Sequence, residues 1–418
     1  MKVIKSGKVL TENGLQKVDI QFDENRIIAI GENLDGDEIV DAHGLTVLPG
    51  LVDVHVHLRQ PGREQKETIH TGTLAAAHGG FTSIFAMPNV IPFPDDVKTM
   101  QEYKALIQKE SVVRTFPYAT ITTEEAGKEV VPMHDLKAYT HWFSDDGVGI
   151  DNDDVMKEAM ETAKKEDVLI AMHTEDMAYR KPGASVHDSP INRDRGYIGI
   201  PSACEAEPLK RDLDLAVSIG NKYHACHISC IESVQYLQEA KAAGGNISAE
   251  VTTHHLLLED KDVQGPMWKM NPPLRSHADR MALIEGLENG TLDFIANDHA
   301  PHTLAEKNQS MEKAPFGIVS LETSFPLLYS EFVVKEKRWT LTQLINWMAT
   351  KPAKRFGIPA GEIKVGKYPD FVFADLDATY TIDASKFVSK GKNTPFDGWQ
   401  VQGKICQTIV GGKTVWKG

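Results

Sequence analysis

Two histidines one residue apart end an apolar stretch near residue 50. In the segment Asp53-Val54-His55-Val56-His57, the side chains of a strand would alternate between its two faces. The valines would then face covering helices, and the three polar side chains would point into the interior. Buried imidazoles without partners are costly, and a metal ion that takes their lone pairs removes that cost. The spacing therefore predicts that His55 and His57 bind a metal.

Further polar residues stand where later apolar runs end. One such ending means little, but several together indicate one shared site. The endings are Pro88-Asn89, Asp145-Asp146-Gly147, His173-Thr174-Glu175-Asp176, His227, His254-His255 and Asp298-His299-Ala300-Pro301-His302. We assign no ligand role to His254-His255, for which packing or support of the ligands is the better interpretation.

The number of candidate ligands indicates more than one metal. The candidates are His55, His57, His173, His227, Asp298 and either Asp145 or Asp146, between which the spacing does not choose. A structural zinc takes four ligands, whereas this set would serve two metals that share a bridging carboxylate or hydroxide. Imidazole and carboxylate without thiolate suit Zn²⁺, with Mn²⁺ or Co²⁺ as replacements. Such a pair generates hydroxide near neutral pH and polarises a carbonyl, which predicts hydrolysis of a carbonyl compound or its reverse.

The elements that would position these residues alternate between strand-like and helical. Helical segments such as Asp154–Lys165 and Glu232–Ala243 separate eight apolar runs, as in repeated parallel βαβ units. The runs are Leu51–Leu58, Thr82–Met87, Val113–Ala119, Ala138–Ser144, Val168–Met172, His224–Ile228, Asn246–Thr252 and Asp293–Ala296. Their number and spacing predict an α/β fold, a (β/α)₈ TIM-type barrel, whose strands deliver catalytic residues from their carboxyl ends. The alternative is an open doubly wound sheet, but no GxGxxG follows any strand to support nucleotide binding.

Both ends of the chain show a different pattern. Short strands separated by turns such as Asn13-Gly14 occupy the first part, and a strand, Gly411-Gly412 and a second strand end the chain. We therefore predict a small β-sandwich domain made of residues 1–48 and 359–418, and a barrel domain at 49–358.

Composition excludes several partners. With 59 acidic and 45 basic residues, the formal net charge of the 418-residue chain is −14, which disfavours nucleic acid and anionic membrane surfaces. No secretory signal or membrane-length apolar run is present. Four cysteines make no disulfide framework, so we expect a cytoplasmic protein.

Eight segments of the chain, in order, resemble those of one enzyme family. They are Asp53-Val54-His55-Val56-His57-Leu58-Arg59, Met87-Pro88-Asn89, Asp145-Asp146-Gly147-Val148-Gly149, His173-Thr174-Glu175-Asp176, Cys226-His227-Ile228-Ser229, Asn271-Pro272-Pro273-Leu274-Arg275, Asp298-His299-Ala300-Pro301-His302 and Ala314-Pro315-Phe316-Gly317. The sequence resembles dihydroorotases of the bacterial type I form, within the amidohydrolase superfamily. The resemblance implies the reversible cyclisation of N-carbamoyl-L-aspartate to L-dihydroorotate and water in de novo pyrimidine (UMP) biosynthesis.

The resemblance also implies residue roles. Zinc, two ions per subunit, would be held by His55, His57, Asp146, His173, His227 and Asp298, with Asp146 as the bridge. Asp298 would also be the catalytic proton shuttle. Substrate would contact His57, Arg59, Asn89, Asn271, His302, Phe316 and Gly317, with Arg59, Asn89 and His302 on its carboxylate and the others near the ring. A homodimer is usual for the family, and aspartate transcarbamoylase is a further expected partner.

Two alternatives stay open. Another cyclic amidohydrolase, such as a hydantoinase or allantoinase, would typically bridge its metals with a carboxylated lysine, whereas Lys137 stands at the wrong end of the fourth run. A non-catalytic scaffold for aspartate transcarbamoylase would be expected to have lost ligands, and all six are present. The segment Leu304–Gly317 is equally compatible with a lid and with an ordinary solvated connection.

Overall fold

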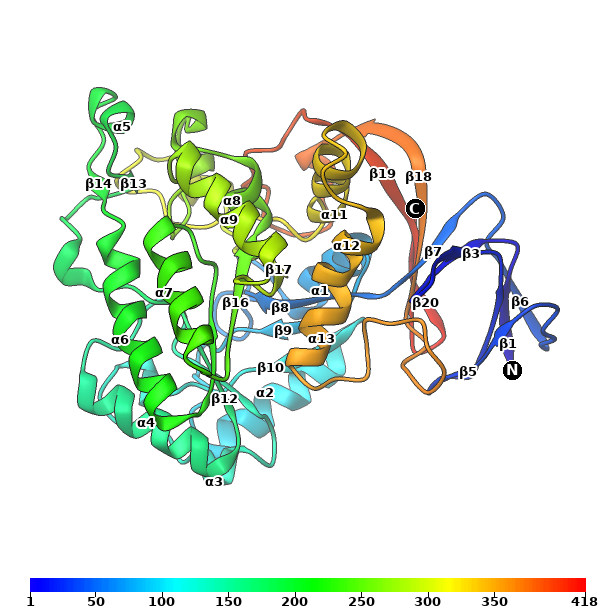
Figure 1. Ribbon diagram of the computed structural model, residues 1–418, viewed down its shortest axis with the longest axis horizontal. Helices are drawn as coiled ribbons and strands as arrows, with labels where there is room; N and C mark the ends of the chain where they lie inside the picture. Colours follow the sequence, from blue (N-terminus) through cyan, green and yellow to red (C-terminus); the bar gives the residue numbers. More distant parts are fainter.

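A closed ring of parallel strands forms the centre of the computed structural model, which describes residues 1–418 (Figure 1). A three-stranded and a five-stranded sheet are joined by single bridges, Ala119 to Phe143 and Val56 to His299, which close the ring. The strands are β8 (Leu51–Val56), β9 (Phe81–Ala86), β10 (Arg114–Pro117), β11 (Trp142–Ser144), β12 (Leu169–Met172), β15 (Lys222–Ala225), β16 (Ile247–Thr252) and β17 (Phe294–Ala296). The predicted barrel is confirmed, and the open doubly wound sheet is wrong because no free edge remains.

Helices surround this ring, and polar caps fix where several of them begin. Thr68, Asp96 and Ser276 each accept a hydrogen bond from the backbone N–H of the third helical residue, which satisfies a donor that the helix itself leaves free. The main helices are α1 (Ile69–His78), α2 (Val97–Glu110), α3 (Met133–Leu136), α4 (Asp153–Glu166), α6 (Ala203–Ile219), α7 (Ile231–Ala242), α9 (His277–Asn289), α11 (Ser324–Leu328), α12 (Leu341–Ile345) and α13 (Lys351–Arg355). Rim loops carry α5 (Pro190–Asp194), α8 (Thr253–Leu257), α10 (Leu304–Lys307), β13 (Val186–His187) and β14 (Gly199–Ile200).

The first barrel strand departs from strict alternation. The pairing of β8 with β9 shifts register between Asp53 and Val56, so one extra residue is accommodated there. Val54 packs in a cluster with Phe85 and Phe294, whereas Val56 belongs to the main core. The expectation that the valines share one face is therefore wrong, since a bulge breaks the two-residue period.

Two sheets built from both ends of the chain lie at one side of the barrel, where the blue and red strands of Figure 1 meet. One sheet holds β1 (Lys2–Lys5), β4 (Asp19–Phe22), β5 (Ile27–Gly31) and β6 (Glu38–Asp41), and the other holds β2 (Lys8–Thr11), β3 (Gly14–Gln16), β7 (Thr46–Pro49), β18 (Phe371–Thr381), β19 (Gln400–Val410) and β20 (Lys413–Lys417). Apolar side chains of both sheets, among them Ile20, Val47 and Phe373, form a separate core between them. The two sheets are thus the expected sandwich.

The division at residues 48/49 and 358/359 stays a prediction. The segment between β18 and β19 leaves the sandwich, because Ile382 and Phe396 pack with Leu258, Met270 and Ile318 of the barrel loops. All four cysteines are free thiols. No helix is both long enough and apolar enough to cross a membrane.

Phe356 fills the amino-terminal end of the barrel. Its ring centroid lies 4.7 Å from that of Phe85 and 5.5 Å from that of His224, with Trp142 and Phe294 at 6.3 and 6.2 Å. These rings come from four different strands, so one side chain joins them.

Replacing this ring should destabilise the fold strongly. We expect Phe356→Ala to lower the free energy of unfolding by about 3–5 kcal/mol, because it removes buried contacts and leaves a cavity, and Phe356→Leu to cost less. Urea unfolding followed by circular dichroism measures this. A loss below ~1 kcal/mol in Phe356→Ala would contradict the role given to Phe356.

Candidate metal centre and active site

The carboxylate of Asp146 lies between two of the predicted histidine ligands. Its Oδ1 is 3.3 Å from Nε2 of His55, and its Oδ2 is 3.3 Å from Nε2 of His57. Asp298, just after β17, places Oδ1 3.0 Å from Nε2 of His57 and 3.6 Å from Nε2 of His55. The ends of three strands thus bring two carboxylates and two imidazoles together.

The remaining two histidines complete the group. His227 has Nε2 3.7 Å from Oδ1 of Asp146, and Nδ1 of His173 lies 2.9 Å from that same Nε2. Both side chains are buried. All six residues predicted as metal ligands therefore lie in one cluster at the carboxyl ends of the strands.

The donor atoms of this cluster fit a cation. His55 Nε2 and Asp146 Oδ1 are buried and form no hydrogen bond, and buried polar atoms are normally paired. The ligand atoms of His55, Asp146 and His227 lie within 4.8 Å of one another, as do those of His55, His57 and Asp298. Imidazole and carboxylate together suit zinc or a similar divalent metal.

The choice between the two neighbouring aspartates becomes clear from their contacts. Asp145 accepts hydrogen bonds from the N–H groups of Ile121 and Thr122, at 2.7 and 3.1 Å, and from the Thr122 hydroxyl. It holds the loop after β10, while Asp146 faces the histidines. The structure thus places Asp146, as the family resemblance implied, at the cluster.

Electrostatics keep the second carboxylate of the cluster ionised. Burial alone would raise the pKa of Asp298, but its hydrogen bond with His57 and the nearby imidazoles of His55, His57 and His227 together hold that pKa well below its usual range. Asp298 is therefore a carboxylate at neutral pH and is able to accept a proton.

Glu250 is a part of the site that sequence reasoning missed. It lies inside the barrel on β16 with no exposed surface, and its Oε1 accepts hydrogen bonds from Nδ1 of His55 at 2.7 Å and from the N–H of His227 at 3.2 Å. Its Oε2 lies 3.0 Å from Nε2 of His224. Glu250 thus fixes the His55 tautomer so that the Nε2 lone pair faces the cluster. The available signal was an acidic residue in the middle of the run 247–252.

Two residues singled out in the sequence lie outside the cluster. The carboxylate of Asp53 accepts hydrogen bonds from the backbone N–H groups of His55 and Asn297, so it holds strand ends rather than a ligand. His254 is buried with both ring nitrogens unpaired, and burial next to His255 lowers its pKa well below the normal value. His254 is therefore a neutral imidazole, and no structural feature assigns it a ligand role.

A cavity of about 240 Å³ opens above the cluster. It is lined by all seven residues predicted to contact substrate: His57, Arg59, Asn89, Asn271, His302, Phe316 and Gly317. Glu175 and Arg180, to which we had given no role, line it as well. Predicted metal ligands and predicted substrate contacts therefore line one cavity.

Arg59 is the positively charged residue of this cavity that keeps hydrogen-bond donors free for a ligand. Its Nε donates to the carbonyl of Pro301 at 3.3 Å, and its two terminal nitrogens have no partner in the protein. Burial lowers its pKa to about 10, so the guanidinium stays charged at neutral pH. A planar fork held at one end and free at the other can bind a carboxylate through two hydrogen bonds.

Asn89 and His302 are more fully engaged than the sequence suggested. Asn89 Oδ1 accepts from Nδ1 of His57 at 2.9 Å, and its amide nitrogen donates to the carbonyl of Asp146, so it supports two metal ligands. His302 donates from Nε2 to the Phe316 carbonyl at 2.7 Å, and its Nδ1 faces the Lys66 ammonium at 3.2 Å. Burial and nearby cations lower the pKa of His302 to about 2, so it is neutral.

Glu175 links a predicted metal ligand to the far wall. Its Oε2 accepts from the Asn271 amide at 2.9 Å and lies 3.4 Å from Nε2 of His173, while Arg180 donates to its Oε1 at 2.5 Å. The side-chain carbonyl oxygen of Asn271 stays free to accept a hydrogen bond from a ligand. In the sequence, Glu175 stood among the polar endings but was given no role, and Arg180 lies five residues further on, outside every segment that was singled out.

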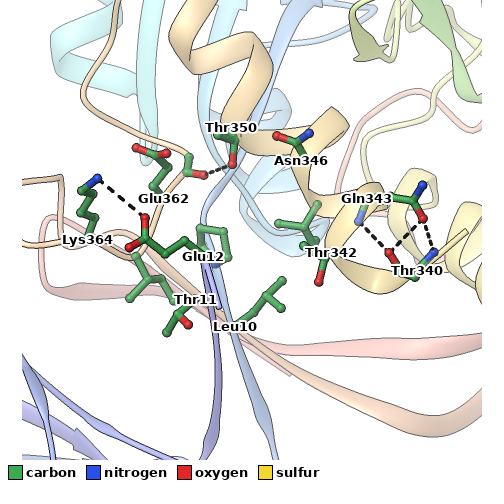
Figure 2. Close-up of a pocket in the computed structure, with 14 residues that line it drawn as sticks. Leu10, Thr11, Glu12, Thr340, Thr342, Gln343, Asn346, Thr350, Glu362 and Lys364 are labelled. Carbon is green, nitrogen blue, oxygen red and sulfur yellow. Dashed lines mark hydrogen bonds and ion pairs between the residues drawn. The ribbon is translucent and has the colours of Figure 1, made fainter. Parts of the chain in front are cut away.

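Another cavity, of about 320 Å³, lies between β2 and the α12 region (Figure 2). Its wall carries hydroxyl and amide side chains, and Lys364 lies 3.8 Å from Glu12 there. It contains no histidine or cysteine, so it offers none of the chemistry found at the barrel rim.

Comparison with known proteins places the chain in a family. A family model described as dihydro-orotase-like matches residues 44–233. The chain is 49% identical to the dihydroorotase of Halalkalibacterium halodurans, with 99% of this chain and 98% of that protein covered. It is 50% identical to the dihydroorotase of Geobacillus thermodenitrificans, with the same coverage. The chain belongs to the dihydroorotase family. The recognition made from its motifs is confirmed.

Solved structures show the wider relationship. L-hydantoinase (dihydropyrimidinase) from Arthrobacter aurescens has a TM-score of 0.90 and 26% identity, covering 100% of this chain and 96% of that one. Dihydropyrimidinase from Brevibacillus agri has a TM-score of 0.86 and 24% identity, and the match covers 100% of this chain and 95% of that one. This similarity shows a shared fold. In this dihydroorotase-family chain position 146 is an aspartate. Lys137, at the start of the same run, forms an ion pair with Glu166 at 2.5 Å.

Removing the charge of Glu250 should weaken metal binding. We expect Glu250→Gln to lower zinc affinity roughly 10–100-fold, because the carboxylate orients His55 and raises its basicity. Competition with a chromophoric chelator measures the affinity without relying on turnover.

Glu259→Gln is the control, since Glu259 is also a buried carboxylate but contacts Lys261, His277 and Arg280, away from the cluster. Equal zinc affinity in wild type and Glu250→Gln would show that this contact does not support the metal.

Proposed function

We propose that the protein is a dihydroorotase that interconverts N-carbamoyl-L-aspartate with L-dihydroorotate and water. One observation carries this proposal: the free guanidinium fork of Arg59 faces the same cavity as the buried histidine and aspartate cluster. A cyclic amide that also bears a carboxylate matches both features. Family membership supports the same reaction.

The substrate carboxylate would pair with the terminal nitrogens of Arg59, and one N–H of Asn89 is free to add a hydrogen bond. The Asn271 carbonyl oxygen would accept from a ring N–H. These contacts orient the ring so that its reacting carbonyl meets the cluster. Neutral His302 would contribute to the carboxylate only after giving up its bond to Phe316.

His55, His57, Asp146, His173, His227 and Asp298 would hold the metal, for which we propose zinc, two ions with Asp146 between them. Bound zinc supplies Lewis-acid polarisation of a carbonyl and acidifies water. The residues of the chain orient the reacting groups and move a proton.

Asp298 would move that proton. In hydrolysis its carboxylate accepts a proton from the attacking water and returns it to the ring nitrogen when the bond from that nitrogen to the ring carbonyl carbon breaks. In cyclisation the carbamoyl nitrogen attacks the side-chain carboxyl carbon and gives a proton to Asp298. The bond from that carbon to one carboxylate oxygen breaks, and the oxygen leaves as water with the proton from Asp298 and a second proton from solvent. The homodimer, the cytoplasmic location and docking to aspartate transcarbamoylase stay predictions.

A substrate panel with metal analysis tests the proposed function. We expect the zinc-loaded protein to turn over L-dihydroorotate and N-carbamoyl-L-aspartate but not hydantoin or allantoin. Asp298→Ala should lose turnover, because the proton carrier is gone, with an unchanged circular dichroism spectrum. Turnover of hydantoin alone would support a different cyclic amidohydrolase, and absence of both zinc and turnover would support a scaffold.

The proposed carboxylate contact has its own test. We expect Arg59→Met to raise KM for L-dihydroorotate roughly 10–100-fold, the effect of losing a hydrogen-bonded charge worth about 1.5–3 kcal/mol. Steady-state kinetics measures this, together with binding of dihydroorotate amide, which lacks the carboxylate. If Arg59→Met weakened the acid and the amide equally, Arg59 would not be the carboxylate contact.

A further inference from the structure

Lys307 is a buried lysine without an acidic partner. Its side chain has no exposed surface, and its ammonium donates to the backbone carbonyls of Lys269, Pro315 and Gly317 at 3.1, 3.1 and 3.0 Å. Three donors thus meet three acceptors. The carbonyls of Pro315 and Gly317 flank or belong to the Phe316–Gly317 wall of the substrate cavity, and the Lys269 carbonyl also accepts from the N–H of Gly317.

Asn393 reaches the same wall from the carboxyl-terminal part of the chain. Its side-chain amide donates to the carbonyls of Gly317 and Ala300, at 3.0 and 3.1 Å, and its Oδ1 accepts from the N–H of His302 at 3.1 Å. Asn393 is also fully buried, and its own carbonyl accepts from Val319. The Gly317 carbonyl therefore receives hydrogen bonds from both Lys307 and Asn393.

The rest of the wall is equally constrained. Gly317 has φ of 125° and donates its N–H to Lys269, and a Cβ there would lie 2.6 Å from that of Ala300. The Phe316 ring lies between the Lys269 ammonium and the Arg180 guanidinium, at 4.3 and 4.5 Å from its centroid. Of the four backbone polar groups of Phe316 and Gly317, the Phe316 N–H alone has no partner in the protein and is free to meet substrate.

The hydrogen bonds of Lys307 offset part of the cost of its burial. Burial and the nearby Lys269 ammonium lower the pKa of Lys307 to about 7, so near neutral pH the amine is present in both its charged and its neutral form. In both forms its N–H groups donate to the surrounding carbonyls, and moving the loop away would leave a buried amine without partners.

We propose that Lys307 and Asn393 are positioning residues that hold the Phe316–Gly317 peptide as a preformed wall of the substrate cavity, so that Leu304–Gly317 is a fixed specificity element rather than a lid. This inference rests on the proposed function, because Phe316 and Gly317 are proposed substrate contacts. Lys307 and Asn393 themselves touch no reacting atom.

The experiment compares Lys307→Met, Asn393→Ala and the double variant with Lys313→Met, an exposed lysine of the same loop whose ammonium has no partner. We expect each single variant to raise KM for L-dihydroorotate about tenfold, with kcat within about threefold of wild type and zinc content unchanged. Because both residues donate to one carbonyl, the double variant should lose less than the product of the single effects. Lys313→Met should match wild type.

Unchanged KM in both folded variants would overturn the proposal, as would losses in kcat that follow lost zinc. If Lys307→Met does not fold, Asn393→Ala still decides the result. Hydrogen exchange in the wild-type protein gives a second readout, measured over residues 304–315 so that the Phe316 N–H proposed to meet substrate is left out. A fixed wall predicts slow exchange that dihydroorotate changes less than twofold, and strong protection of this segment by dihydroorotate would indicate a lid. Wild type without any dihydroorotate turnover would instead refute the proposed function.

Discussion

The crowding of ionisable groups in a water-poor space is the constraint on which the rest of the structure depends. Taking a charge out of water costs several kcal/mol, and here Asp146, Asp298 and Glu250 are buried beside imidazoles. Their mutual contacts offset that cost only while the strand ends keep their spacing. Closure of the barrel by the Val56–His299 bridge fixes this spacing, since it joins the segments that carry His57 and Asp298.

Much of the fold and of the cluster could be predicted because both depend on local patterns. Strand-length apolar runs alternating with capped helices specify a barrel, and the barrel dictates that residues at the ends of the runs meet. The pattern failed where geometry departs from its period, as at the bulge in β8, which moves Val54 out of register with Val56. Glu250 was missed because it lies within β16 and not at the carboxyl end of the strand, where the barrel pattern places functional residues.

The residue types that line the cavity do not by themselves show which groups bind a ligand. Several polar groups near it are already committed to one another: Asn89 to His57, His302 to Phe316, Glu175 to Arg180. Because these hydrogen bonds already hold the side chains in place, ligand binding loses less side-chain conformational entropy. Few groups remain without a partner, namely the terminal nitrogens of Arg59, one side-chain N–H of Asn89, the side-chain carbonyl oxygen of Asn271 and the backbone N–H of Phe316. These groups define the polarity that a ligand must match.

The segment between β18 and β19 makes the sandwich and the barrel structurally dependent on each other. Although the sandwich and the barrel have separate cores, Asn393 inserts between barrel loops, and Ser389 donates to Glu67 beneath α1. The sandwich is therefore not an interchangeable part. A chimera that exchanged the whole carboxyl-terminal part between relatives would place foreign residues against the wall of the substrate cavity, because Asn393 bonds Gly317 there. Residues 382–399 would therefore have to be kept with the barrel.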